Sequence, residues 1–320
     1  MISKRIKLFL LLSGLMGLNV FAVSAYWEEH RPERLAVCPV FVAQEATNRT
    51  ESASEEKGKE SGDEETDEKN YVTANDDLSN LQLSDATTPV YDRYTLQERE
   101  ERKLTTALPK LTPFKAAGKI AYLTFDDGPD NKNTPDVLKI LREKNVKATF
   151  YVVGRMAENN PAVLKDIFAA GHAIGNHSYD HNYRNLYPNK DKFLAQIVKT
   201  DGIIHKILGV RPLIIRAPGG TVGMFTKDYP PLLKQKGYAY HDWNIENGDA
   251  VMKNATADRL INNVLREMRE DVPDNSMLII LMHCGGGKEE TVKALPRLID
   301  LLRERGYEFG VVTPMTPPAW

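Results

Sequence analysis

Two adjacent carboxylates, Asp126-Asp127, follow an apolar run and precede Gly128-Pro129. Asp-Gly-Pro is ordinary turn chemistry, but a turn does not need the second carboxylate. Two like charges at the end of a buried strand oppose each other's ionisation unless a cation separates their roles. A bound metal ion would resolve this conflict.

Two histidines four residues apart, His177 and His181, follow a later expected strand. Side chains at this spacing share one face of a helical turn, and imidazole is a good ligand for divalent transition metals. With Asp127 they offer two nitrogens and one oxygen and leave a position open for water or substrate, as a catalytic zinc site requires. The same set suits iron(II) oxygenases, so the ligands alone do not choose the chemistry.

Further polar residues follow other expected strands: Arg216 before Ala-Pro-Gly-Gly, Asp249 at the end of a polar stretch that begins at Asp242, and His283 after Leu-Met. Taken alone, an arginine before Pro-Gly-Gly can anchor a loop, and a single histidine is often a satisfied core residue. Stability does not explain polar residues at the ends of five successive strands. Parallel barrel enzymes collect their catalytic groups there, and this convergence indicates an active site.

From about Ala116, short β-like runs alternate with amphipathic stretches, which is the pattern of strands joined by crossover helices. The expected strands cover residues 120–125, 148–153, 172–175, 213–215, 238–243, 277–282 and 307–312. The expected helices cover residues 134–144, 161–170, 190–208, 227–236, 257–270 and 289–305. About seven strands predict an α/β fold with a parallel, incomplete (β/α) barrel, and an open doubly wound sheet is the alternative.

Residues 1–25 are predicted to be a signal peptide, because basic residues precede an apolar run that ends in Val23-Ser24-Ala25. An uncleaved N-terminal anchor is the alternative. Residues 26–115 are expected to be an acidic, largely disordered linker, with one short helix near residues 96–103 that packs on the following domain. The catalytic domain is then residues 116–320. Export places the protein outside the cytoplasm, either secreted or in the cell envelope.

The overall charge excludes some classes of partner. The chain has 42 basic and 44 acidic residues and a net charge of −2, which provides no field for binding nucleic acid or an anionic membrane surface. We expect contact with a membrane only through an uncleaved N-terminal anchor. Cys38 and Cys284 are the only cysteines, so the fold does not rest on a disulfide framework, and the sequence does not say whether they pair.

From about residue 116 to the end, the chain resembles the polysaccharide deacetylases of carbohydrate esterase family four. Thr124-Phe-Asp-Asp-Gly128 is similar to the first motif of the family, and His177-Ser-Tyr-Asp-His181 is similar to the second. Arg216-Ala-Pro-Gly-Gly220, the stretch ending at Asp249, and Leu281-Met-His283 resemble the third, fourth and fifth motifs. The family fold is a distorted parallel barrel, in agreement with the expected strands.

The resemblance implies a role for each matching residue. Asp127, His177 and His181 would bind one divalent metal ion, zinc in the first place, with cobalt, nickel and manganese as alternatives. Asp126 would be the general base and His283 the general acid. Arg216 would orient Asp126, and Asp249 would support His283. Leu281 would line the pocket for the acetyl methyl group.

Two positions depart from the family pattern. Gly219, whose backbone N–H would stabilise the oxyanion, stands where many relatives carry an aromatic residue. Ala250 follows Asp249 where relatives often have tryptophan, and Trp243 is expected to fill part of that space in the sugar groove. The departures leave deacetylation as the expected activity and put the sugar in question.

The sequence therefore predicts an exported, metal-dependent hydrolase that removes acetyl groups from N-acetylated glycans. The expected partner is a cell-wall glycan containing N-acetylglucosamine or N-acetylmuramic acid. One alternative is an O-acetyl esterase acting on xylan, since ester cleavage needs the same metal and base. The other is a non-catalytic wall-binding module of the same fold. The presence of the acid, the base and all three ligands argues against it.

Overall fold

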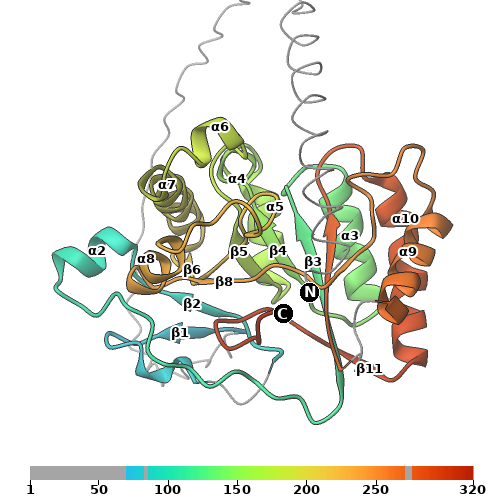
Figure 1. Cartoon of the computed structure of the whole chain (residues 1–320), viewed down its shortest axis with the longest axis horizontal. Helices are drawn as coiled ribbons and strands as arrows, with labels where there is room; N and C mark the ends of the chain where they lie inside the picture. The colour runs from blue at the N-terminus through green and yellow to red at the C-terminus, as the bar shows by residue number, and fades with distance from the viewer. Residues whose placement is uncertain (1–69, 83–85, 271–275, 320) are drawn as a thin grey trace, which may run out of the picture. The chain divides into compact units, whose positions relative to one another are not determined.

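The computed structural model of the chain describes residues 70–82, 86–270 and 276–319 (Figure 1). All of them belong to one compact unit, residues 65–320. The predicted signal peptide, Cys38 and about half of the predicted linker lie outside the described residues. Within the described ranges, no helix is long and apolar enough to cross a membrane.

The main sheet of the described chain has eight strands, all paired in parallel. Its order is β8-β7-β5-β4-β3-β10-β9, and β11 also pairs with β3. The strands are β3 (Lys119–Asp126), β4 (Thr149–Val152), β5 (Ala173–Asn176), β7 (Ile214–Ile215), β8 (Ala239–Tyr240), β9 (Ile245–Glu246), β10 (Met277–His283) and β11 (Tyr307–Gly310). All seven expected strands are present, β9 is added to them, and the predicted distorted parallel barrel is confirmed.

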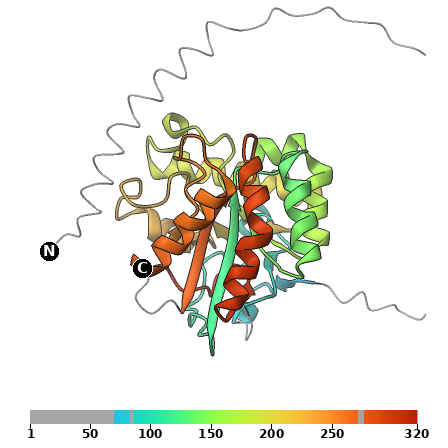
Figure 2. The ribbon, with the colours of Figure 1, turned by 90° about the vertical axis from the view of Figure 1, so that its right-hand side faces the viewer.

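Helices connect the strands and cover the outside of the curled sheet. They are α3 (Asn133–Glu143), α4 (Gly154–Asn159), α5 (Pro161–Ala169), α6 (Tyr183–Leu186), α7 (Lys190–Leu208), α8 (Tyr229–Gln235), α9 (Ala257–Glu270) and α10 (Glu289–Glu304). The six expected helices are present, and the short helices α4 and α6 were not expected. Helices α3, α10 and α9 lie side by side over β3 and β10 (Figures 1 and 2).

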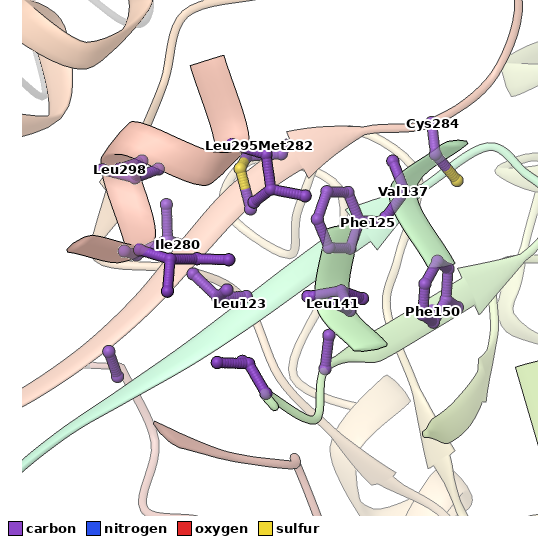
Figure 3. Packing of buried hydrophobic residues seen from close by; sticks show 14 of the residues in the cluster. Leu123, Phe125, Val137, Leu141, Phe150, Ile280, Met282, Cys284, Leu295 and Leu298 are labelled. Atoms are coloured by element: carbon purple, nitrogen blue, oxygen red, sulfur yellow. The ribbon is translucent and has the colours of Figure 1, made fainter. Parts of the chain in front are cut away.

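The two faces of β3 contact different parts of the protein. Leu123 and Phe125 belong to the main core beneath α3 and α10, where Figure 3 shows them among Leu141, Leu298 and their neighbours. Tyr122 belongs instead to a second cluster on the inner side of the sheet. Because successive side chains of a strand alternate between its faces, Asp126 faces the inner side with Tyr122.

Strand β10 divides its side chains in the same way. Ile280 and Met282 join the main core, whereas Ile279 joins the inner cluster. By the same alternation, Leu281 and His283 face the inner side. Burial of each large apolar side chain stabilises the fold by about 1.5–3 kcal/mol, so the outer core holds both strands in the register that positions their inner polar residues.

The described residues before β3 are folded, although the sequence assigned them to the linker. They form β1 (Val72–Ala74), the 3-10 helix η1 (Ser79–Leu81), β2 (Val90–Asp92) and α2 (Leu96–Glu101). Strands β1 and β2 make a small sheet with β6 (Arg211–Pro212). The expected short helix is α2, which begins with a capping box of Thr95 and Glu98. The folded part of the chain therefore begins before residue 116.

A buried group of charges joins this segment to the barrel. Asp92, Arg99 and Arg211 are each 0% exposed. Arg99 donates to both carboxylate oxygens of Asp92, at 2.5 and 3.0 Å. Arg211 donates to one of the same oxygens from Nη2, at 3.0 Å. One carboxylate thus binds two guanidinium groups, which come from α2 and β6, and Asp201 lies 3.6 Å from the second of them.

We expect Asp92→Asn to lower the free energy of unfolding by about 3–5 kcal/mol, because it leaves the buried Arg99 guanidinium without its counter-charge and leaves Arg211 with only Asp201, 3.6 Å away. Urea denaturation followed by circular dichroism measures this change. The control is Asp228→Asn, which removes the partner of Lys190 from a pair whose side chains are 36% and 48% exposed. The control should change stability only slightly. Equal losses in the two variants would contradict the structural role assigned to Asp92.

Candidate active site

The strand ends bring the predicted polar residues to one edge of the sheet. Asp126 ends β3 and His283 ends β10, and the register of these parallel strands places the two residues opposite each other. Asn176 ends β5 and is paired with Ile215 at the end of β7. His177 follows Asn176 and Arg216 follows Ile215, so these side chains begin from the same edge.

Asp127, His177 and His181 lie together as a possible ligand set. One ligand atom from each residue lies within 4.8 Å of the other two. Nε2 of His181 is 3.4 Å and Nε2 of His177 is 3.8 Å from Oδ1 of Asp127. His177 is buried, whereas the side chains of His181 and Asp127 are about one-third exposed, at 33% and 35%. Two imidazoles and one carboxylate with one accessible side fit a divalent ion of the zinc type.

The local backbone differs from the expected helical turn. Ser178 and His181 have φ values of 67° and 54°, and Asp127 has a φ of 73°, so all three are left-handed. Left-handed conformation costs a non-glycine residue about 1–2 kcal/mol. Asn176 offsets this cost at Ser178, because its side-chain oxygen accepts the Ser178 N–H at 2.9 Å. The two histidines therefore converge through a strained bend.

His177 is prepared to act as a neutral ligand. Burial, followed by the neighbouring His181, lowers the pKa of His177 to about 3. Its Nδ1 lies 2.8 Å from the carbonyl oxygen of Arg216, an acceptor, so Nδ1 carries the proton. The lone pair of Nε2 is then directed toward Asp127 and Asp126.

Asp126 is buried and paired with a buried arginine. Nη1 of Arg216 donates to Oδ1 of Asp126 at 2.9 Å and to the hydroxyl of Thr124 at 2.7 Å. The other oxygen, Oδ2, lies 3.6 Å from Nε2 of His177. Burial raises the pKa of Asp126, and the charges of Arg216 and His283 oppose this rise without cancelling it. The carboxylate therefore binds a proton more readily than an exposed aspartate.

His283 and Asp249 form the opposite side of the site. Nδ1 of His283 lies 2.6 Å from Oδ1 of Asp249, and the His283 N–H donates to Oδ2 at 3.0 Å. Burial acts to lower the pKa of His283, but the hydrogen bond and charge of Asp249 outweigh it, and the pKa is raised. Thr291 and Lys288 hold Asp249 in place through its carboxylate and its carbonyl oxygen. This arrangement leaves Nε2 of His283 to carry a mobile proton.

The three predicted substrate-contact residues have different surroundings. Leu281 is 6% exposed and lies two residues before His283 on the inner face of β10. Gly219 has a φ of 77° and adjoins the ring of Tyr183. Trp243 is half-buried, with its indole near the α-carbon of Gly220 and 5.7 Å from the Arg216 guanidinium. It therefore packs behind the loop of the third motif.

Sequence reasoning missed several residues that shape the site. Asp242 accepts hydrogen bonds from the N–H and hydroxyl of Thr221 and so fixes the loop after Gly219-Gly220. Its place at a strand end was a visible signal, although its partner was not. Tyr183 and Thr291 lie in no motif, and their spacing gave no signal.

Known proteins resemble this chain in sequence and fold. A family model for polysaccharide deacetylases matches residues 115–241. A peptidoglycan-N-acetylglucosamine deacetylase of Bacillus cereus is 34% identical over 219 residues, which cover 64% of this chain and 75% of that protein. The catalytic domain of a peptidoglycan N-acetylglucosamine deacetylase from Eubacterium rectale has a TM-score of 0.56 and 31% identity, covering 64% of this chain and 94% of that chain.

A CE4 esterase of Streptococcus mutans is similar at a TM-score of 0.58 and 29% identity, covering 61% of this chain and 86% of that chain. The family model ends before Asp249 and His283, and the matches to these three relatives cover 61–64% of this chain. The chain belongs to the polysaccharide deacetylases of carbohydrate esterase family four, a family of hydrolases.

Proposed function

We propose that this protein is a metal-dependent N-deacetylase that releases acetate from N-acetylglucosamine or N-acetylmuramic acid in peptidoglycan. The observation that carries the proposal is the placement of Asp126 and His283 opposite each other, beside the cluster of Asp127, His177 and His181. The names of the Bacillus cereus and Eubacterium rectale relatives support the choice of glycan. Such a substrate requires a secreted or envelope-bound enzyme, in agreement with the predicted export signal.

Asp127, His177 and His181 would hold the metal ion, and their donor set favours zinc, with cobalt, nickel and manganese as alternatives. When bound, the ion would polarise the acetyl carbonyl and make a nearby water molecule more acidic. Asp126 takes the proton from that water as general base. Arg216 occupies Oδ1 of Asp126, so Oδ2, which faces His177, is the oxygen that receives the proton.

The Gly219 N–H is the donor for the negative charge that develops on the former carbonyl oxygen. Among the described residues it has no protein acceptor, whereas the next N–H, of Gly220, is bonded to the carbonyl of Ala217. A donor left free and fixed by a rigid loop stabilises the oxyanion without reorganisation. Leu281 would receive the methyl group of the acetyl, because it is the apolar side chain two residues before His283 on the same strand face.

His283 protonates the departing amine. Expulsion of an amide nitrogen requires a proton, because an amide anion is too basic to leave. An alkoxide leaves with far less assistance, so an O-acetyl esterase has less need of this residue. The Asp249 carboxylate raises the pKa of His283 and so favours its protonated form. This pair favours the N-deacetylase over the O-acetyl esterase.

Substitution of the ligands and of the base should have separable effects. We expect Asp127→Ala and His177→Ala to lose bound metal, because each removes one of three ligands. Asp126→Asn should retain the metal and lose about 10²–10⁴-fold in kcat, the range for removal of a general base. Elemental analysis and acetate release measure the two properties. Full metal content in Asp127→Ala would show that the ligands are misassigned.

The fall of kcat at high pH should reflect deprotonation of His283. Its pKa is raised above 6.5, and the acid acts when protonated, so kcat should fall as the pH rises through that raised value. Asp249→Asn removes the charge that stabilises the imidazolium, so the fall should move to lower pH. The measurement is kcat for acetate release as a function of pH. A fall that does not move in the variant would exclude His283 as its origin.

Substitution of His283 should also distinguish amide cleavage from ester cleavage. We expect His283→Ala to lose about 10²–10⁴-fold in kcat on an N-acetylated glycan and much less on an O-acetylated sugar. Both activities are measured as acetate release under the same conditions. Strong esterase activity that hardly changes in the variant, with no amide cleavage by the wild type, would favour the esterase alternative.

A further inference from the structure

Three exposed apolar side chains follow strands that end beside candidate site residues. Among the described residues, the large apolar side chains that are exposed are Tyr183, Val222, Tyr240 and Val251, at 42%, 52%, 36% and 54%. Tyr183 follows β5, Val222 follows β7 and Val251 follows β9. Single exposed apolar residues are common and need no explanation. Three after strands that end beside site residues indicate a rim for a partly apolar ligand.

Tyr183 is the aromatic residue of this rim and lies beside the ligand set. Its ring centroid is 5.7 Å from that of His181, in an edge-to-face arrangement at 76°. The same ring lies against the α-carbon of Gly219. A Cβ atom at Gly219 would be 2.5 Å from the Tyr183 hydroxyl and 3.1 Å from Cε1. Tyr183 thus fills the space that a side chain at position 219 would occupy.

The position of this ring is fixed from several sides. Tyr183 is the first residue of α6, whose N-cap Asn182 accepts the N–H of Arg184 at 3.0 Å. Its ring packs at 5.7 Å on that of Tyr187. The Tyr187 hydroxyl in turn donates to the carbonyl of Pro218, next to Gly219, at 2.7 Å. A ring held this way loses little freedom when a ligand binds.

We propose that Tyr183 is a specificity-determining residue that stacks on the pyranose ring of the N-acetylated sugar and holds it beside the metal ligands. This inference rests on the proposed deacetylase function. The large substituents of a β-linked N-acetylglucosamine ring are equatorial, so its axial C–H groups form an apolar face that matches an aromatic ring. A small acetyl compound without a pyranose ring offers no such face and gains nothing from Tyr183.

The test compares Tyr183→Ala with the matched control Tyr183→Phe, which keeps the ring and removes the hydroxyl. The substrates are a β-linked N-acetylglucosamine tetramer and a small alkyl acetate. For the tetramer, we expect Tyr183→Ala to raise KM by about tenfold with kcat nearly unchanged, the pattern for loss of uniform binding. Tyr183→Phe should behave like the wild type. Turnover of the alkyl acetate and metal content should stay unchanged in both variants.

A binding measurement tests the same contact without turnover. Titration calorimetry of the tetramer into metal-loaded Asp126→Asn should give an affinity that falls about tenfold when Tyr183→Ala is added. In this background, Gly219→Ala should weaken binding as well, because its Cβ displaces the ring. The two substitutions together should not be additive, since both remove one contact. Additive losses would contradict the contact between Tyr183 and position 219 as the cause.

The outcomes separate this inference from the proposed function. Acetate release by the wild type, with KM and affinity unchanged in Tyr183→Ala, would overturn the role of Tyr183 and leave the deacetylase intact. Loss of metal, or an equal loss on the alkyl acetate, would overturn it in favour of a role through His181. A wild type that releases no acetate from any N-acetylated glycan would overturn the proposed function, and the calorimetry would still decide on Tyr183.

Discussion

The ion pair of Asp126 with Arg216 is the interaction around which the site is built. Both residues are almost completely buried, and neither charge has bulk water to stabilise it. The Arg216 guanidinium also donates to the carbonyl oxygens of His241 and Asp242, at the end of β8. It therefore connects the ends of β3, β7 and β8 through a single group. Removal of either partner would leave an uncompensated buried charge, which costs far more than the pair itself contributes.

The convergence of the candidate site residues could be predicted from the sequence because strands impose their geometry locally. The carboxyl ends of parallel strands meet at one edge, so Asp126, Arg216 and His283 had to converge once the strands were recognised. Because side chains alternate between the two faces of β3 and β10, their inner residues lie on the same side of the sheet. Ligand chemistry alone did not say which residue is the base, the acid or a metal ligand. The resemblance to a family assigned these expected roles.

Other features depended on contacts that a local pattern does not contain. The described residues before β3 follow a segment dominated by acidic and small polar residues, and they fold because Leu78, Leu81 and Val90 pack with Leu213, far along the sequence. The spacing of His177 and His181 predicted a helical turn, but Asn176 stabilises a left-handed residue at Ser178 instead. In both places a partner distant in sequence, or a side chain bonded to the backbone, overrode the local preference.

The strained bend that carries the histidines is connected to the buried charges of the small sheet. The amide of Asn176, which holds Ser178, donates to Asp201 at 2.7 Å. Asp201 also accepts the hydroxyl of Tyr238 and lies 3.6 Å from Arg211, the arginine that binds Asp92. A continuous polar network thus extends from the segment before the barrel to the ligand loop. Left-handed residues persist only where their surroundings fix them, so this segment contributes to the site without reaching it.

Chemistry and specificity reside in different parts of this fold. The residues proposed as base and acid, and those that hold them, belong to strand ends or follow them, where the packed core fixes them. The walls of the groove belong to loops, and there Tyr183 fills the space left by Gly219 from a different element, α6. A ring from α6 thus lies beside the proposed metal ligands in place of an aromatic side chain at position 219, and it comes from a different direction. A motif can therefore indicate the reaction from sequence, whereas the proposed contact of Tyr183 with the sugar depends on α6, which lies outside the motifs.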